Sequence, residues 1–458
     1  MPRSNDHDDD HDSSRATSPR RGRGRAQTSQ AAPSKNQPLV VRAEAIDPAA
    51  LDQDALRVIS RLVRQGHEAY LVGGCVRDLM IGRKPKDFDV ATSANPRQVK
   101  RLFRNGRVIG RRFRLVQIHY SGHIIETATF RREPDPTTNG SALDDLLIVE
   151  DNDYGTAEED ARRRDFTVNG LFLDPTEHRI LDYVGGLDDL EARLLRTIGD
   201  PLVRLAEDPV RILRAIKFAT RLGFRIEEGT WEAMRQHAPE LARSAPPRVM
   251  EEVLRLLRSG SALGAFRMMR KCGALAVVLP ALDEHMGPLE SSSPEENERK
   301  ERVWRLLEAL DADVQRGGQP SNALLLAVLF HDVVERACEL EGLENPTGVE
   351  WTEVACDVID PVVTEARLAR RDCVRARRVL FQQRRFTQAP NRRFRPLLFM
   401  ASEEFEEALQ LFRLRTAAWG QGWDVVEGWL ERFEAAKAAT AEELAVERRR
   451  SRRRRRKR

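Results

Sequence analysis

Apolar residues recur at helical intervals in the segment between Asp52 and Gln65. The positions concerned are Leu51, Ala55, Val58, Ile59, Leu62 and Val63. This spacing is typical of an amphipathic helix, and the glycine that follows at position 66 is a residue that commonly ends one. We therefore expect a helix here, packed on the first strand of the chain.

The next segment predicts two short strands joined by a turn and a helix. Residues 68–72 predict the first strand, Gly73-Gly74 the turn and residues 76–81 the helix, and the second strand carries Asp87-Phe88-Asp89. Further on, Asn95-Pro96 is typical of a helix start, with asparagine as the cap and proline in the first turn. We expect that helix to end at about residue 103.

A β-hairpin is predicted after this helix. Residues 108–120 and 124–130 form its strands, and Ser121-Gly122 forms the turn between them. Glu126 lies on the second strand and has two open interpretations, a third acid beside the aspartates or an ordinary strand residue.

Beyond Gly223 the apolar spacing predicts mainly helices. The periodic segments are 247–258, 262–280, 301–311, 321–339, 351–365, 396–419 and 422–436. Polar segments at 286–299 and 316–320 predict linkers between helices. Residues 1–38 are low in complexity and are expected to be a disordered tail.

The length of the chain indicates how many domains it forms, and its charge indicates what kind of partner it binds. At 458 residues the chain should form more than one domain, because single cores stop growing at about 250–300 residues. Its net charge is +4, but residues 448–458 hold ten basic residues, and removing these charges leaves −6 on the rest. A basic tail on an acidic body indicates a polyanionic partner.

Cysteine usage and hydropathy indicate the compartment. The five cysteines are scattered without a C-x-x-C pair, which argues against a zinc site and suits a reducing cytoplasm. Neither a membrane-spanning apolar run of 18 residues nor a signal-peptide core is evident, so we expect a soluble cytoplasmic protein.

Candidate chemistry lies between residues 71 and 90. Side chains two apart on a strand share a face, so Asp87 and Asp89 should present paired carboxylates, which suit Mg²⁺. Gly73 and Gly74 would let the backbone approach a phosphate, and Arg77 adds positive charge nearby. Together these features predict metal-assisted phosphoryl or nucleotidyl transfer.

The chain resembles a known family over about residues 40–435. LVGG-x-VRD followed by KDFDV resembles the opening motif of the class II nucleotidyltransferases, which are the bacterial poly(A) polymerases and the tRNA CCA-adding enzymes. RRDFT-x-N at 163–169, residues 182–190 and the EDxxR element at 207–211 resemble later motifs of the family. VIGRRFRL at 108–115 resembles the signature of the poly(A) polymerases, although Gln117 stands where histidine is expected.

The resemblance and the local patterns together give each candidate residue a role. The acids are the metal ligands Asp87 and Asp89, with either Glu126 or Asp165 as a third catalytic acid. The triphosphate would lie against Gly73, Gly74, Arg77, Asp78, Arg163 and Arg164. The adenine base would be read by Glu207, Asp208 and Arg211. RNA would contact Arg111, Arg112, Arg114, Arg384, Arg385, Arg392 and Arg393, and also stack on Phe405 and Phe412.

The implied fold is α+β. We expect a small mixed-sheet nucleotidyltransferase head at 39–190, a helical neck at 191–260, a helical body and RNA-binding region at 261–436 and a disordered arginine-rich tail at 437–458. The implied activity is polyadenylation of RNA 3′ ends with two Mg²⁺ ions. ATP, RNA 3′ ends and the RNA-decay machinery are the expected partners of a monomer.

Two other functions remain open from the sequence. A CCA-adding tRNA nucleotidyltransferase would share nearly every motif, and an RNA-binding protein with an inactive head is the third alternative. The pair His331-Asp332 is similar to that of metal-dependent phosphohydrolases, but without companion histidines it is interpreted as structural.

Overall fold

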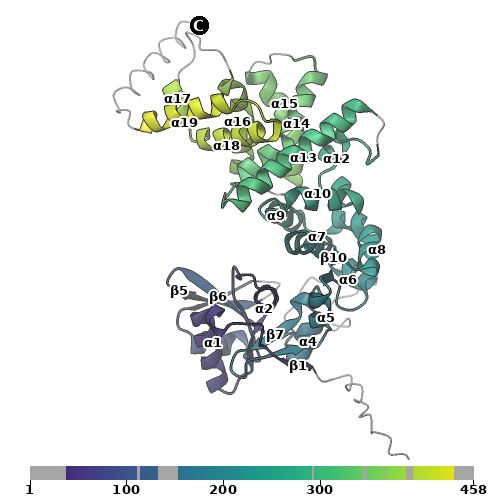
Figure 1. Cartoon of the computed structure of the whole chain (residues 1–458), viewed down its shortest axis with the longest axis vertical. Helices are drawn as coiled ribbons and strands as arrows, with labels where there is room; N and C mark the ends of the chain where they lie inside the picture. The colour runs from purple at the N-terminus through teal and green to yellow at the C-terminus, as the bar shows by residue number, and fades with distance from the viewer. Residues whose placement is uncertain are drawn as a thin grey trace, which may run out of the picture. The chain divides into compact units, whose positions relative to one another are not determined.

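The computed structural model describes residues 38–110, 114–132, 153–290, 293–343, 348–366, 368–387 and 396–437. The described residues belong to one compact unit that begins at Pro38. The predicted disordered tails, and the RNA-binding candidates Arg111, Arg112, Arg392 and Arg393, lie outside the described residues. In Figure 1 the sheet has the purple and blue colours and the helices from α6 onward the teal to yellow colours, so sheet and helices follow one another along the chain.

An eight-stranded mixed sheet forms the N-terminal region. Its strand order is β1-β8-β7-β2-β3-β6-β5-β4, in which β3 and β6 are parallel and the other neighbours antiparallel. The strands are β1 (Leu39–Arg42), β2 (Ala69–Val72), β3 (Asp89–Thr92), β4 (Gly106–Ile109), β5 (Leu115–Tyr120), β6 (His123–Thr129), β7 (Leu171–Asp174) and β8 (Arg179–Asp182). The prediction of an α+β fold with a mixed sheet is confirmed.

Two details of the predicted strands are wrong. Residues 108–120 form parts of two antiparallel strands, β4 and β5, instead of one, because Gly110 takes a positive φ of 86° and ends the first. The strand β3 begins at Asp89, so Asp87 lies in the segment that leads into it. The β5–β6 hairpin across Ser121-Gly122 is as predicted.

Three helices cover the sheet region close to their predicted bounds. Helix α1 (Gln53–Arg64) is capped by the Asp52 carboxylate and packs on β2 and β3. Helix α2 (Gly74–Met80) begins two residues earlier than predicted. Helix α3 (Pro96–Leu102) has the expected asparagine cap, which Gln98 completes as a capping box.

The chain from residue 153 to the end of the neck contributes further short elements. They are α4 (Ala157–Arg162), α5 (Gly186–Glu191), β9 (Leu194–Leu195), α6 (Pro201–Glu207), α7 (Val210–Leu222), β10 (Arg225–Ile226), α8 (Glu228–His237) and α9 (Pro246–Leu257). The turn before α5 is built by Asp182, whose carboxylate accepts hydrogen bonds from the backbone N–H groups of Val184, Gly186 and Leu187. That contact explains the acid in this motif as a structural one.

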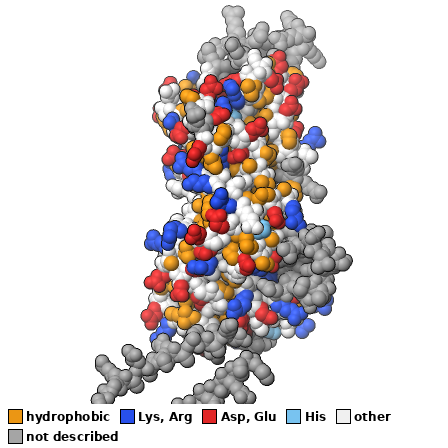
Figure 2. Space-filling view, turned by 90° about the vertical axis from the view of Figure 1, so that its right-hand side faces the viewer, with side chains coloured by type: hydrophobic (Ala, Val, Ile, Leu, Met, Phe, Trp, Pro, Cys, Tyr) orange, Lys and Arg blue, Asp and Glu red, His pale blue; other side chains and the backbone are white. Residues whose placement is uncertain are grey.

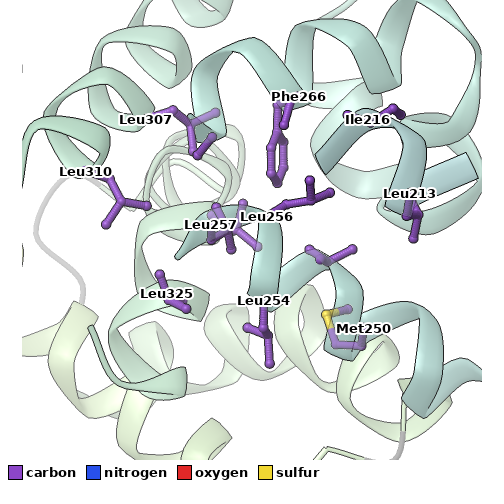
Figure 3. Close-up of a cluster of buried hydrophobic side chains, with 14 of the residues drawn as sticks. Leu213, Ile216, Met250, Leu254, Leu256, Leu257, Phe266, Leu307, Leu310 and Leu325 are labelled. Carbon is purple, nitrogen blue, oxygen red and sulfur yellow. The ribbon is translucent and has the colours of Figure 1, made fainter. Parts of the chain in front are cut away.

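The remaining helices share a hydrophobic core with α7 and α9. They are α10 (Ala262–Lys271), α11 (Ala274–Val278), α12 (Pro280–His285), α13 (Pro294–Gln315), α14 (Asn322–Leu340), α15 (Gly348–Ala366), α16 (Arg370–Phe386), α17 (Pro396–Met400), α18 (Phe405–Trp419) and α19 (Trp423–Lys437). Figure 3 shows buried side chains that meet from α7, α9, α10, α13 and α14, among them Leu213, Ile216, Met250, Leu254, Leu256, Leu257, Phe266, Leu307, Leu310 and Leu325. The neck is thereby continuous with the helices that follow. No helix in the described part of the chain has the length and apolar character that a membrane crossing requires.

In this region the main error of the sequence prediction is that it missed helical segments rich in polar residues. The segment 286–299 is only partly a linker, because Ser293 caps α13 and Pro294 occupies its first turn. Helix α16 was not predicted. Its arginines obscure the apolar spacing, and they form ion pairs with acids of other helices, as Arg378 does with Glu404.

Candidate active site

A cavity of about 660 Å³ joins the sheet region to α7 and α9. Most of the predicted site residues line it, namely Gly73, Gly74, Arg77, Asp78, Asp87, Asp89, Arg163, Arg164, Asp165, Asp208 and Arg211. Glu126, Glu207, Arg114, Arg384 and Arg385 are not among its lining residues. The structure therefore brings the acid, phosphate and base candidates together around one space.

The glycine turn between β2 and α2 forms one wall of this cavity. Gly73 has a φ of 73°, a conformation that favours glycine. A Cβ atom added at Gly73 would come within 3.0 Å of Arg164 Nη1, so the absence of a side chain also lets this arginine approach the turn. Any other residue at position 73 would strain the backbone and push away a cavity arginine.

Carboxylates gather on the sheet next to this turn. Asp89 on β3 is directly opposite Glu126 on the parallel strand β6, so the two side chains leave the same face. Asp89 is open to the cavity although protein surrounds it. Burial, then Glu126, and more weakly Asp87, raise the pKa of Asp89 to about 6, against the opposing effect of Arg164.

Gln117, which stands where the family resemblance leads us to expect histidine, contacts one of these acids. It lies opposite Glu126 on β5, and its Nε2 donates a hydrogen bond to Glu126 Oε1 at 3.0 Å. Glu126 is thus oriented by a neighbouring strand while it remains beside Asp89. The amide at position 117 orients an acid of the site.

Asp165 is engaged in a different way from the acids on the sheet. Its Oδ1 accepts from the Phe166 backbone N–H and from Asn169 Nδ2, and its Oδ2 accepts from Arg214 Nε and Nη2 at 2.9 and 2.7 Å. Burial alone would raise the pKa of Asp165, but Arg214 and these hydrogen bonds outweigh it and lower the pKa to about 2. All four bonds hold the anion, so Asp165 connects the segment after α4 to α7.

We expect Asp165→Asn to lower the free energy of unfolding at pH 7 by about 2 kcal/mol, because the asparagine does not keep a charge opposite Arg214. The folded-state pKa lies below the unfolded one, so this stabilisation is complete above about pH 5 and is lost as the pH falls through 4 toward 2. Urea unfolding of the wild type and the variant at pH 7, 4 and 3 measures the difference.

The matched control for this prediction is Asp188→Asn, which changes an exposed carboxyl in the same region. It should change the free energy of unfolding by less than about 0.5 kcal/mol at each pH. Equal stability of wild type and Asp165→Asn at pH 7 would contradict the assignment.

Arginines dominate the rest of the cavity wall. Burial, followed by the charges of Arg131, Arg164, Arg204 and Arg211, lowers the pKa of Arg163 to about 9. Asp160 neutralises part of the positive charge of these arginines, because its Oδ2 lies 2.9 Å from Arg164 Nη2. A cluster in which arginines repel one another favours a bound anion such as a phosphate chain.

The positive charge of Arg77 is already paired with the acid next to it in the sequence. It is only 2 % exposed, its Nε and Nη2 donate to Asp78 Oδ1, and its Nη1 donates to Asn169 Oδ1. Asp78 also accepts from Arg221 of α7 at 3.0 Å. Arg77 and Asp78 therefore brace the glycine turn and tie it to α7.

The neck side of the cavity carries the base-recognition candidates. Asp208 lies between α6 and α7, and its side chain does not cap α7, because Pro209 holds the cap position. Its Oδ2 instead accepts from Arg248 Nη2 at 2.9 Å, and its buried Oδ1 has no hydrogen-bond partner among the described residues. Asp208 thus keeps one acceptor available at the cavity.

Arg211 is held in place by α6. Its Nη1 donates to the Arg204 backbone carbonyl at 2.5 Å and to Glu207 Oε2 at 3.1 Å. Glu207 does not line the cavity, so its part is to orient Arg211. Both residues of the predicted reading pair are consequently fixed by neighbours before a ligand arrives.

The three predicted RNA-binding residues that the structure describes, Arg114, Arg384 and Arg385, do not line this cavity. Arg385 on α16 lies over the rings of Phe381 and Phe399, with its guanidinium carbon 5.4 and 5.6 Å from their centroids. Phe405 and Phe412 belong to a buried aromatic cluster, so the prediction that they stack on RNA bases is wrong. Arg114 precedes β5, and Arg384 lies on α16. On the face that Figure 2 presents, basic and acidic side chains are interspersed instead of separated by sign.

The sequence interpretation missed four arginines that line the cavity, one of which is Arg131, after β6. Arg214 and Arg221 lie on α7 beyond the EDxxR element, and Arg248 lies on α9. The positions of Arg214 and Arg221, three and ten residues after Arg211 on one predicted helix, place them near the same face. Arg248 is 40 residues from Asp208, and no local pattern predicts that contact.

Sequence profiles of three families match the chain. A family described as "Poly A polymerase head domain" matches residues 69–196, and "Probable RNA and SrmB- binding site of polymerase A" matches 223–286. The third, "Polymerase A arginine-rich C-terminus", matches 349–458. The first match contains the glycine turn and all the candidate acids.

Individual proteins show the same relationship over longer ranges. Poly(A) polymerase I of Haemophilus influenzae is 34% identical over 413 residues, which are 88% of this chain and 89% of that protein. A CCA-adding enzyme of Geobacillus kaustophilus is 36% identical over 263 residues, 57% of this chain and 63% of that protein. The solved structure of the Bacillus stearothermophilus CCA-adding enzyme with CTP superposes with a TM-score of 0.60 at 26% identity, over 84% of this chain and 82% of that one.

Proposed function

The chain belongs to the bacterial poly(A) polymerase family, and we propose that it transfers AMP from ATP to the 3′-hydroxyl of RNA without a template, with release of pyrophosphate. The observation that carries the proposal is a single cavity that joins paired acids, a glycine turn with arginines and the Asp208–Arg211 pair. The relative named poly(A) polymerase I is matched over 88% of the chain, against 57% for the relative named CCA-adding enzyme.

In this proposal Asp87 and Asp89 hold two Mg²⁺ ions, with Glu126 as the third acid. The residues fit a cation because Glu126 and Asp87 both raise the pKa of Asp89, and a bound cation would relieve that repulsion. When bound, the ions would activate the RNA hydroxyl and stabilise the departing pyrophosphate. The proposal gives Asp165 a structural part instead, because its carboxylate already accepts four hydrogen bonds.

The triphosphate would lie between the glycine turn and the arginine cluster. Gly73 and Gly74 line the cavity, and Arg163 and Arg164 beside them would neutralise the charge of the phosphate oxygens. An anion there would also reduce the repulsion that lowers the pKa of Arg163. Arg77 acts indirectly, by bracing the turn through Asp78 and Asn169.

The base would be read by the pair on the neck. The Asp208 Oδ1 would accept from the adenine amino group, and Arg211 would donate to the adjacent ring nitrogen. Cytosine offers a similar donor and acceptor on a smaller ring. Adenine places these two atoms farther from the ribose than cytosine does. Rejection of CTP would therefore depend on the distance between the ribose and the Asp208–Arg211 pair, which Arg248 and Glu207 hold in place.

An incorporation assay tests the activity. The full-length protein is incubated with Mg²⁺, an unstructured RNA and each nucleotide alone. In parallel it is incubated with a tRNA that lacks its 3′ end, with each nucleotide alone and with CTP and ATP together. We expect a long ladder with ATP on the unstructured RNA and little extension with CTP, GTP or UTP. The products are resolved by denaturing gel electrophoresis.

The other outcomes separate the two remaining functions. Addition that stops after three nucleotides, and only on the tRNA, would establish a CCA-adding enzyme, which the superposition on that fold keeps as the second candidate. Tight RNA binding without incorporation would indicate an inactive RNA-binding protein.

The surroundings of the reaction follow from the same proposal. The enzyme would act as a cytoplasmic monomer on messenger and other RNA 3′ ends, in contact with RNA-decay proteins. Residues 223–286, which match the family described as an RNA and SrmB binding site, are the region assigned to these contacts. The arginine run at 448–458 would add electrostatic RNA binding that weakens with salt.

A further inference from the structure

A cluster of ionisable side chains lies among the helices after the neck, away from the cavity described above. His331, Asp332 and Glu335 are on α14, and their ligand atoms all lie within 4.8 Å of one another. His285 at the end of α12 places its Nε2 2.8 Å from Asp332 Oδ2. His285 is thus the companion histidine that the sequence interpretation did not find, and the purely structural interpretation of His331-Asp332 needs revision.

His331 is the least satisfied member of this cluster. Its side chain is 2 % exposed, and neither ring nitrogen makes a hydrogen bond with a described residue. Glu335 Oε1 lies 3.4 Å from Nε2 without forming one. A buried polar group without a partner is unfavourable unless a water or an ion completes it.

Two arginines balance the acids. Arg302 of α13 places its Nη2 2.6 Å from Asp332 Oδ1 and 3.5 Å from Glu335 Oε2, and Arg415 of α18 lies 3.8 Å from Glu335. Two carboxylates and two guanidinium groups leave the cluster neutral. A divalent ion would therefore need one guanidinium to leave.

Arg302 has a place to which it can move. Its side chain is one-third exposed, and it lines a second cavity of about 150 Å³ together with Asp332, Glu295 and Glu298. Glu298 precedes Arg302 by four residues on α13, the spacing at which a helix allows an ion pair. The guanidinium can exchange one acidic partner for another without unfolding the helix.

We propose that His331, Asp332 and Glu335 form a binding site for one divalent transition-metal ion of the Zn²⁺ type, with Arg302 as the cation that the metal displaces. One imidazole and two carboxylates form a donor set that suits zinc. His285 would hold Asp332 from outside, as second partners of metal ligands commonly do. The ion would be held by α14 alone, at the position where Arg302 now links α13 to α14.

Zinc titration of the chelator-treated full-length protein tests the proposal by calorimetry. The comparison is between wild type and His331→Gln. Zinc that binds to the acids of the head, or to His7 and His11 near the N-terminus, contributes equally to both titrations and cancels in their difference. We expect one equivalent of Zn²⁺ to be lost in the variant. Arg302→Gln removes the competing cation and should bind that equivalent at least tenfold more tightly than the wild type.

Two further measurements guard against a folding defect. Zinc should raise the thermal midpoint of Arg302→Gln but not that of the Arg302→Gln, His331→Gln double variant, and Glu335→Gln replaces His331→Gln if the latter does not fold. The control His119→Gln changes an exposed histidine on β5 that belongs to neither cluster of possible metal ligands in the described residues, and it should leave the calorimetric result unchanged. Identical zinc stoichiometry in wild type, His331→Gln and Glu335→Gln, or no tighter binding in Arg302→Gln, would overturn the proposal.

Discussion

Asp89→Asn is expected to lower AMP incorporation by about 10³-fold, equivalent to about 4 kcal/mol in the activation barrier. Asparagine keeps the size of the side chain but removes the negative charge that would hold a divalent cation beside the glycine turn. The measurement is kcat for ATP on an unstructured RNA at saturating Mg²⁺. Circular dichroism and RNA binding by fluorescence anisotropy should remain as in the wild type, because asparagine keeps the size and shape of the side chain that faces the cavity.

The matched control is Asp54→Asn, which makes the same change in the same region but outside the cavity. It should retain incorporation within about twofold. A variant of Asp89 with more than one-tenth of the wild-type kcat would remove this carboxylate from the catalytic centre, whatever its effect on Mg²⁺ affinity.

Arg211→Ala is expected to reduce the preference for ATP over CTP by about 10²-fold, which corresponds to about 2.7 kcal/mol. The guanidinium is held by Glu207 and the Arg204 carbonyl, so its removal takes away a donor fixed for a purine. In the wild type, a bound cytosine would leave the Arg211 guanidinium unpaired, which disfavours CTP. Without that guanidinium the energetic difference between ATP and CTP disappears. The ratio of kcat/KM for the two nucleotides, measured on the same RNA, gives the effect.

Arg225→Ala serves as the control because this arginine is exposed on β10 and does not line the cavity. Its nucleotide preference should equal that of the wild type. If Arg211→Ala lowers kcat/KM for ATP and CTP by the same factor, Arg211 contributes to binding in general and does not select the base.

Residues with a local pattern were predictable from the sequence. The helix α1 and the capped helix α3 follow from apolar spacing and from the residues at their starts. The position of Glu126 beside Asp89 was only one of two open interpretations, because the sequence predicts a strand at each residue but not which strands are neighbours. The arginine content of α16 obscured its helical spacing, and the polar start of α13 resembled a linker.

Contacts between distant segments could not be predicted. Asp165 was weighed as a catalytic acid because its motif contains it, yet its partner Arg214 is 49 residues away. Arg248 and Asp208 are 40 residues apart, and His285 and Asp332 are 47 residues apart. Such pairs arise from the packing of helices, and a single sequence does not report that packing.

Helix α7 gives these contacts a common consequence. It carries Arg211 at its first turn, and it is bonded to the sheet region through Arg214 to Asp165 and, near its end, through Arg221 to Asp78. At 1.5 Å per residue, the base-reading arginine and the last bond are about 15 Å apart along one helix axis. The geometry of the helix therefore fixes the distance and the direction of Arg211 relative to the sheet region. A single-residue insertion between Arg211 and Arg214 would rotate the Arg211 side chain by about 100° away from the nucleotide.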